Sequence, residues 1–79
     1  MPETLVLYHF PSCPFCQYVM RYLDKRNIKI SMKDILENKT YKEELIRIGG
    51  KSQVPCLVID GKALYESVDI VKWFEKNYK

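Results

Sequence analysis

With 79 residues, 47% of them hydrophobic, the chain can form one domain and has no room for a second core. Its net charge is +3, and the basic side chains are mixed with acidic ones instead of gathering on one face, which argues against a nucleic-acid partner. The sequence has neither a membrane-spanning apolar run nor the basic start and apolar stretch of a signal peptide, so we expect a cytoplasmic protein with no membrane partner.

The first elements predicted along the chain are a strand and a helix. Residues 4–8 are a short apolar run typical of a buried strand, and residues 9–12 form the loop that follows. A helix is predicted from Pro14 to about Arg26, and Asn27 is a suitable residue to end it. Its apolar face repeats at the i, i+3, i+4, i+7 spacing, with Cys16, Val19, Met20 and Leu23.

Two cysteines, Cys13 and Cys16, lie where the loop leads into this helix. In a small α/β domain, a Cys-x-x-Cys pair at this place indicates a redox dithiol. The N–H groups at a helix N-terminus lack intrahelical partners and carry partial positive charge, so they should favour the thiolate of Cys13, which is the nucleophile in disulfide exchange. Cys16 lies one turn further on, within reach of a mixed disulfide formed at Cys13. Pro14 suits the first helical position, where its missing N–H has no bond to lose.

The middle of the chain predicts an edge strand and a second helix. Residues 28–35 alternate apolar and polar side chains, and the lysines on the polar side should discourage pairing with another chain. Residues 38–48 return to helical spacing, and Gly49-Gly50 ends the helix. The apolar positions that set this spacing are Tyr41, Leu45 and Ile48.

The last third predicts a hairpin and a final helix. Residues 56–59 are a continuous apolar strand, and Asp60-Gly61 indicates a hairpin turn into residues 62–65. We expect Ser67 to be the N-cap of the last helix, with Asp69 in its first turn. The apolar residues of this helix are Val68, Ile70, Val71, Trp73 and Phe74. The order β-α-β-α-β-β-α predicts an α/β fold of thioredoxin-like arrangement, with a mixed four-stranded sheet and helices on both faces.

Three segments match motifs of a known family: Cys13-Pro14-Phe15-Cys16, Gln53-Val54-Pro55 and Glu66-Ser67-Val68-Asp69. In order and spacing they resemble the glutaredoxin family, and the resemblance covers essentially the whole chain. The first segment is similar to the family's Cys-Pro-Tyr-Cys and the second to its Thr-Val-Pro. The third resembles the Glu-Ser segment of glutathione transferase N-terminal domains more than the usual glutaredoxin Gly-Gly-x-Asp.

The resemblance implies a role for the dithiol and for the proline that would face it. Cys13 would be the nucleophile that takes up glutathione from a mixed disulfide, and Cys16 would be the resolving cysteine for protein disulfides. Pro55 would be cis, which would leave the Val54 backbone free to pair with the cysteinyl part of glutathione.

The resemblance also implies binding sites for the two ends of glutathione. Glu66 and Ser67 would receive the γ-glutamyl carboxylate at a helix N-terminus. Lys51 is the candidate for the glycyl carboxylate. The supporting residues would be Pro14, Phe15 and Tyr8, of which Tyr8 is expected to pack under the active-site loop.

The sequence departs from the family pattern at two places. Phe10 stands where many glutaredoxins have a lysine, so a cation that would help to ionise Cys13 is missing. His9 could tune Cys13 near neutral pH, or it could be simply a polar residue at a strand end. Tyr65 and Glu66 stand where Gly-Gly is usual.

A zinc site is the alternative reading of the thiols. Cys13, Cys16, Cys56 and His9 together give a Cys₃His ligand count, but a second close pair is missing, so we expect no metal. Cys56 follows Pro55 in an apolar strand and is interpreted as a small core residue, with a link to the dithiol left open.

The function predicted from these features is a glutathione-dependent thiol-disulfide oxidoreductase. Its partners would be glutathione, as co-substrate, and glutathionylated or disulfide-bonded proteins, and we expect a monomer. One alternative is a thioredoxin-like reductant recharged by a flavoenzyme. Another is a dimeric iron–sulfur carrier ligated by Cys13 and glutathione, which Pro14 argues against by stiffening the loop. We do not expect a transferase acting on electrophiles, because the chain has no room for a second, all-helical domain.

Overall fold

The computed structural model describes residues 4–78, so residues 1–3, on which the expectation about a signal peptide partly rests, lie outside it. The chain forms β1 (Leu5–His9), α1 (Pro14–Lys25), β2 (Ser31–Asp34) and α2 (Lys39–Gly49), followed by β3 (Cys56–Ile59), β4 (Lys62–Tyr65) and α3 (Ser67–Asn77). The predicted order of elements is confirmed. Across residues 4–78, every helix is too short or too polar to cross a membrane.

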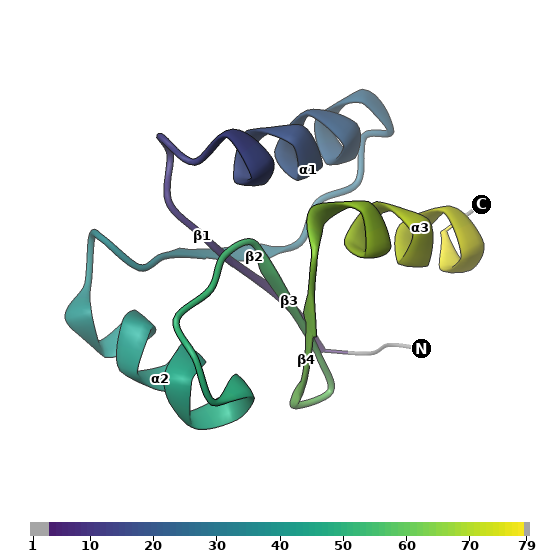
Figure 1. Cartoon of the computed structure of the whole chain (residues 1–79). Coiled ribbons are helices and arrows are strands. Elements are labelled where there is room, and N and C mark those ends of the chain that lie inside the picture. The colour runs from purple at the N-terminus through teal and green to yellow at the C-terminus, as the bar shows by residue number, and fades with distance from the viewer. Residues whose placement is uncertain (1–3, 79) are drawn as a thin grey trace.

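The four strands form one mixed sheet in the order β2-β1-β3-β4. β1 pairs with β2 in parallel, as the crossover through α1 requires, and the β1–β3 and β3–β4 pairs are antiparallel. α1 and α3 cover one face of the sheet and α2 covers the other (Figure 1). The structure is therefore the α/β sandwich of thioredoxin-like type that the sequence predicts.

Alternation along the strands divides the apolar side chains between two cores. Leu7 of β1 and Leu57 of β3 point toward α1 and α3, where they pack with Ile70 and Phe74. The second core, under α2, contains Tyr8, Ile35, Leu45, Cys56 and Val58. Because β1 contributes to both cores, its carboxyl end is fixed from both sides, and this is the end from which the dithiol loop departs.

The second strand is shorter than the predicted range 28–35 because of the way α1 ends. Asn27 takes a positive φ of 57°, and the N–H groups of Asn27 and Ile28 donate to carbonyls of the last turn of α1, at 3.0 and 2.8 Å. This cap uses the backbone of Ile28 to end the helix, so the pairing of β2 with β1 starts only at Ser31.

The buried face of α2 differs from the predicted one by a single residue. Leu45 is fully buried and Tyr41 packs beside it, but Ile48 is 37% exposed. The next position on the buried face is Gly49 instead, where the ring of Tyr65 from β4 occupies the space of a side chain. The predicted stop is confirmed: Gly50 caps the helix with a φ of 85°, and its N–H donates to the carbonyl of Ile46 at 2.7 Å.

The N-cap predicted for the last helix is wrong by one residue. Glu66 is the N-cap and Ser67 is the first helical residue. The carboxylate of Glu66 makes no capping bond; it accepts a hydrogen bond from Gln53 Nε2 at 3.3 Å. Asp69 lies in the first turn as predicted.

Candidate active site

Cys13 caps the N-terminus of α1 with its own side chain. Its backbone is extended, and its Sγ accepts the N–H of Cys16 at 3.4 Å. The N–H of Cys13 donates to the carbonyl of Phe10 at 3.2 Å, which closes the loop, and Pro14 occupies the first helical position. The sulfur thus faces an N–H donor and the positive end of the helix, which is the arrangement that stabilises a thiolate.

Cys16 lies one turn below Cys13 and is fully buried, whereas 6% of Cys13 is exposed. Burial, and then the hydrogen bond with Cys13, raise the pKa of the Cys16 thiol well above its usual range. Cys16 is therefore a neutral thiol at pH 7 and presents no free nucleophile to solvent. The two cysteines are both free thiols, so the site can accept a disulfide.

The segment Gln53-Val54-Pro55 lies at the same end of the sheet as the dithiol loop. Tyr8, next to the end of β1, pairs with Cys56, the first residue of β3, so the residues just before β3 lie beside the start of the dithiol loop. The Val54-Pro55 bond is cis, as the resemblance implies. Pro55 is buried and Val54 is partly exposed, which leaves a short stretch of backbone open for pairing.

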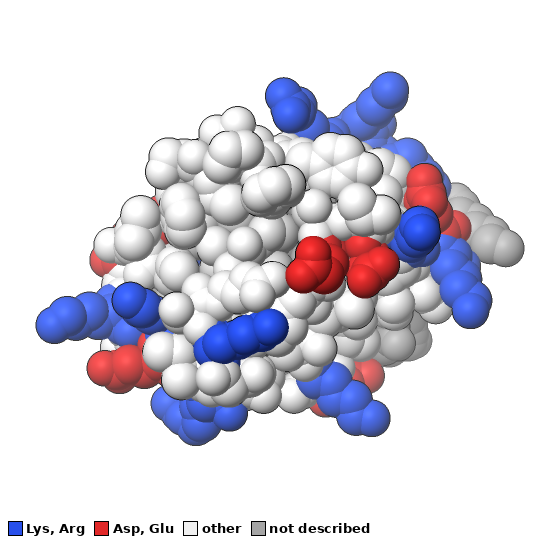
Figure 2. Space-filling view, viewed as in Figure 1, with Lys and Arg blue, Asp and Glu red and all other residues white. Residues whose placement is uncertain are grey.

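Glu66 and Ser67 are joined to this segment by the hydrogen bond between Gln53 and Glu66. Two of the three predicted glutathione-binding segments therefore meet in the structure. Glu66 and Asp69 are both exposed at the start of α3. The surface over the dithiol loop and the first turn of α1 is uncharged in Figure 2.

Glu66 has a positive φ of 73°, which residues with a Cβ disfavour. Glu66→Gly should remove this strain, so we expect the free energy of unfolding to rise by about 0.5–1 kcal/mol after the entropy cost of glycine. Urea unfolding curves of Glu66→Gly and Glu66→Ala distinguish relief of backbone strain from loss of the carboxylate. The alanine variant keeps the strain and, like the glycine variant, lacks the carboxylate. Equal midpoints for the two variants would contradict the prediction.

Lys51 is exposed in the loop between α2 and β3. Its ammonium group lies 4.6 Å from the centre of the Tyr65 ring, a cation–π contact. A lysine held in this way is a fixed point charge on the same side of the fold as the Val54 backbone and the start of α3.

The departure at Phe10 leaves the region next to the dithiol without the lysine that is common in glutaredoxins. Phe10 packs against the core under α2. His9 does not replace the cation: burial lowers its pKa, an effect that nearby Asp34 only partly opposes, so the imidazole is neutral at pH 7. Its Nδ1 is buried without a hydrogen-bond partner in residues 4–78.

The Tyr8 side chain lies on the α2 side of the sheet. Its ring lies in the same core as Phe10, and its hydroxyl donates to Glu44 Oε1 at 2.9 Å. Lys33 Nζ bonds the same oxygen at 2.7 Å and lies over the Tyr8 ring. Tyr8 therefore supports the loop through packing and is not free to contact a ligand. Phe15, by contrast, is 64% exposed beside the dithiol.

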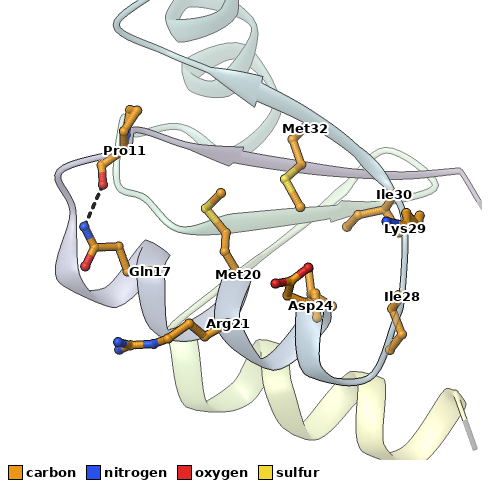
Figure 3. Close-up of a pocket in the computed structure, with 10 residues that line it drawn as sticks. Pro11, Gln17, Met20, Arg21, Asp24, Ile28, Lys29, Ile30 and Met32 are labelled. Carbon is orange, nitrogen blue, oxygen red and sulfur yellow. Dashed lines mark hydrogen bonds between the residues drawn. The ribbon is translucent and has the colours of Figure 1, made fainter.

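An apolar cavity of about 540 Å³ lies on the other flank of α1, away from α3. In Figure 3 the thioether side chains of Met20 and Met32 approach each other across it, and the hydrogen bond from Gln17 to the Pro11 carbonyl closes the end near the dithiol loop. Neither cysteine of the dithiol is among its lining residues.

Cys56 lies on the opposite face of the sheet from the dithiol, in the core under α2. Within residues 4–78, no three His, Cys, Asp or Glu side chains come together as a metal site, so the Cys₃His grouping does not form there. Burial raises the pKa of the Cys56 thiol to about 11 from 9.0, which is typical of a core cysteine and not of a reactive one.

The raised pKa of Cys56 predicts a loss of stability in alkali. The unfolded thiol ionises near pH 9, but the folded thiol keeps its proton until about pH 11, so rising pH favours the unfolded state. Between pH 9 and pH 11, the free energy of unfolding of the wild type should fall by about 2–3 kcal/mol more than that of Cys56→Val. Urea unfolding under reducing conditions at several pH values measures this difference, and parallel pH profiles would contradict it. The Cys16 contribution is shared by both proteins and cancels.

Comparisons with known proteins agree with this geometry. Residues 7–79 match the family described as glutathione S-transferase, N-terminal domain. The chain belongs to this family. Its curated relatives show that it is glutaredoxin-like. It is 29% identical, over 72 residues, to an uncharacterized glutaredoxin-like 8.6 kDa protein in the rubredoxin operon of Clostridium pasteurianum. This match covers 89% of this chain and 96% of that protein. It is also 36% identical over 62 residues to glutaredoxin 1 of Rickettsia prowazekii (strain Madrid E), covering 73% of this chain and 63% of that protein.

Solved structures of the family and of glutaredoxins share the fold. Glutathione transferase Omega 3C from Trametes versicolor superposes with a TM-score of 0.81 at 30% identity, covering 99% of this chain but only 35% of the transferase. Glutaredoxin C1 from Populus tremula x tremuloides gives a TM-score of 0.71 at 19% identity, with 94% and 76% of the chains covered. The chain thus spans about a third of the transferase, and its likeness to both structures shows a thioredoxin-like fold.

Two side chains that connect the segments of this glutaredoxin-like site are not indicated by their own motifs. The hydrogen bond between Gln53 and Glu66 joins residues 13 positions apart. The contact of Tyr65 with Gly49 depends on how α2 packs against β4. The glycine at residue 49, at the end of an apolar helical face, is the sequence signal for this second contact.

Proposed function

We propose that this chain is a glutathione-dependent thiol-disulfide oxidoreductase, acting as a monomer in the cytoplasm. The observation that carries the proposal is the sulfur of Cys13, which caps α1 and accepts the Cys16 N–H at the end of the sheet where the cis Val54-Pro55 bond lies. Its substrates are glutathione mixed disulfides and disulfide-bonded proteins.

In the reaction with a mixed disulfide, only Cys13 exchanges bonds. The Cys13 thiolate attacks the glutathione sulfur, a new disulfide forms between Cys13 and glutathione, and the substrate leaves as a thiolate that takes a proton from water. The thiolate of a second glutathione then attacks the glutathione sulfur of this intermediate. Oxidised glutathione leaves, and Cys13 returns as the thiolate under the Cys16 N–H.

Protein disulfides use Cys16 as well. Cys13 forms a mixed disulfide with one substrate sulfur and releases the other as a thiol. Cys16 then gives up its proton and attacks Cys13, which releases the second substrate thiol and leaves a Cys13–Cys16 disulfide. Two glutathione molecules reduce this disulfide and become one oxidised glutathione. Burial, and then the hydrogen bond with Cys13, raise the pKa of Cys16, so Cys16 is protonated in the reduced dithiol.

The glutathione tripeptide has three proposed contacts. The backbone of the partly exposed Val54 pairs with the cysteinyl part. The free N–H groups at the start of α3, with the Ser67 hydroxyl, bind the γ-glutamyl carboxylate, and the acidic Glu66 lies beside the α-amino group. Lys51 pairs with the glycyl carboxylate.

A second candidate, a thioredoxin-like reductant recharged by a flavoenzyme, is favoured by one observation. Phe10 stands where many glutaredoxins have a lysine and His9 is neutral, so neither of these two residues supplies a cation that would attract anionic glutathione. In this case the dithiol chemistry is the same, but NADPH and thioredoxin reductase supply the electrons.

The test is a turnover assay with a small glutathione mixed disulfide and two reducing systems. One contains NADPH, glutathione reductase and glutathione, and the other contains NADPH and thioredoxin reductase. We expect NADPH consumption in the first system and none in the second. The matched control is the same protein alkylated with iodoacetamide, which blocks Cys13. Turnover in the second system alone would replace the proposal with the thioredoxin-like candidate.

A further inference from the structure

Tyr65 fills the space that a side chain at Gly49 would need. Tyr65 is the last residue of β4 and lies opposite Cys56 in the β3–β4 register. A methyl group on Gly49 would overlap the Tyr65 hydroxyl and would lie 2.8 Å from Cζ of its ring. Gly49 is the last residue of α2, so the ring reaches from the sheet edge to the end of that helix.

The same side chain also contacts the connecting loop, residues 50–55, which links α2 to β3. The Tyr65 hydroxyl donates to the backbone carbonyl of Lys51 at 3.3 Å, and the ring face receives the Lys51 ammonium at 4.6 Å. Burial, and then the neighbouring Cys56, raise the pKa of Tyr65, so the hydroxyl stays protonated and can donate. One side chain therefore fixes both the backbone and the charge of Lys51.

The connecting loop has few regular backbone bonds of its own. It is attached at one end by the cap at Gly50 and at the other by β3, and Gln53 ties its middle to Glu66. Lys51 lies between these attachments, so its position depends on Tyr65. A loop that is already ordered loses less conformational entropy when a ligand binds.

We propose that Tyr65 is a positioning residue, which orders the connecting loop through Gly49 and Lys51 and thereby sets the affinity for glutathione. This inference rests on the proposed function, because Lys51 and Val54 are its glutathione contacts. Tyr65 itself touches neither cysteine of the dithiol in this arrangement, so its effect should appear in binding and not in the chemical step.

Gly49→Ala tests the proposal from a distance, because residue 49 is not a proposed ligand contact. The added methyl group should displace the Tyr65 ring from its contacts with Lys51. Because these contacts are of hydrogen-bond strength, their loss should raise the KM for a small glutathione mixed disulfide about three- to ten-fold. The kcat should stay within about two-fold of the wild-type value. Tyr65→Phe, which removes only the hydroxyl, should raise KM by a smaller factor. Lys42→Ala, an exposed change on α2, is the control and should leave KM unchanged.

A double-mutant cycle separates displacement of Tyr65 from a general effect of the new methyl group. In a Tyr65→Leu background the ring is gone, so Gly49→Ala should add little to the rise in KM. Additive effects, or an unchanged KM in Gly49→Ala, would overturn the proposal. The milder Tyr65→Phe variant keeps the test available if Gly49→Ala fails to fold.

Amide hydrogen exchange distinguishes failure of this inference from failure of the proposed function. If the wild type shows no glutathione turnover but Gly49→Ala speeds exchange selectively at residues 51–54, the ordering role of Tyr65 stands and the proposed function falls. If exchange at these residues is the same in both proteins, the ordering role is wrong, whatever the assay shows.

Discussion

Cys13→Ser is expected to abolish reduction of both glutathione mixed disulfides and protein disulfides, a loss of at least about 10³-fold. The serine hydroxyl stays protonated at neutral pH, and it cannot form the mixed disulfide through which both routes pass. It can still accept the N–H of Cys16, so α1 should keep its cap and the variant should remain folded. Circular dichroism and thermal unfolding check the fold, and the NADPH-coupled assay measures the loss.

Cys16→Ser is the matched variant and should separate the two routes. Reduction of a small glutathione mixed disulfide needs only Cys13, so its rate should stay within about five-fold of the wild type. Reduction of a protein disulfide should stop after one half-reaction, with the substrate held on Cys13. Mass spectrometry should detect this trapped adduct. Full protein-disulfide turnover in Cys16→Ser, or turnover of either substrate in Cys13→Ser, would refute the assignment of roles.

The parts of the fold that depend on neighbouring residues could be predicted from the sequence. β3 and β4 have the bounds that were predicted, because a continuous apolar run and Asp60-Gly61 are local signals. Both turn residues have positive φ, 49° and 86°, as that hairpin requires. α1 begins at Pro14 for an equally local reason.

The errors occur where a distant contact competes with a local signal. Ser67 is a better N-cap than Glu66 by its chemistry, but α3 starts one residue earlier than predicted, because the chain turns at Glu66, whose carboxylate accepts a hydrogen bond from Gln53. Ile48 fits the helical period, but the face of α2 is set by Tyr65 packing on Gly49. Both competing contacts come from a distant segment: Gln53 of the loop before β3 in the first case and Tyr65 of β4 in the second.

In the candidate site, too, features set by neighbouring residues could be predicted, and features set by distant contacts could not. The dithiol, its place at the start of a helix and the cis bond before Pro55 followed from motifs within single segments. Sequence alone did not indicate that His9 is neutral or that Cys56 lies across the sheet from Cys13, because burial and sheet face depend on the whole fold. The place of Cys56 separates it from the dithiol, and the neutral His9 does not replace the missing cation.

Ile70→Ala should be among the most destabilising substitutions in the chain, and its effect should extend to the site. Ile70 is fully buried between α3 and the sheet, and its N–H donates to the Glu66 carbonyl at 3.0 Å, which closes the first turn of α3. Removing its side chain leaves a cavity and should cost about 2–5 kcal/mol, which for a domain of this size lowers the melting temperature by roughly 10–30 °C.

Val68→Ala is the matched control, because Val68 is an apolar residue in the same turn but is 51% exposed. Its effect on the free energy of unfolding should stay within about 0.5 kcal/mol, since it removes no buried contact. Because the start of α3 carries Glu66 and Ser67, loosening it through Ile70→Ala should also weaken glutathione binding at temperatures where the variant is still folded. Similar melting temperatures for the two variants would mean that α3 is not held by its buried face, and the position of the γ-glutamyl site would then need another explanation. A lower melting temperature with unchanged glutathione affinity would instead place that site away from the start of α3.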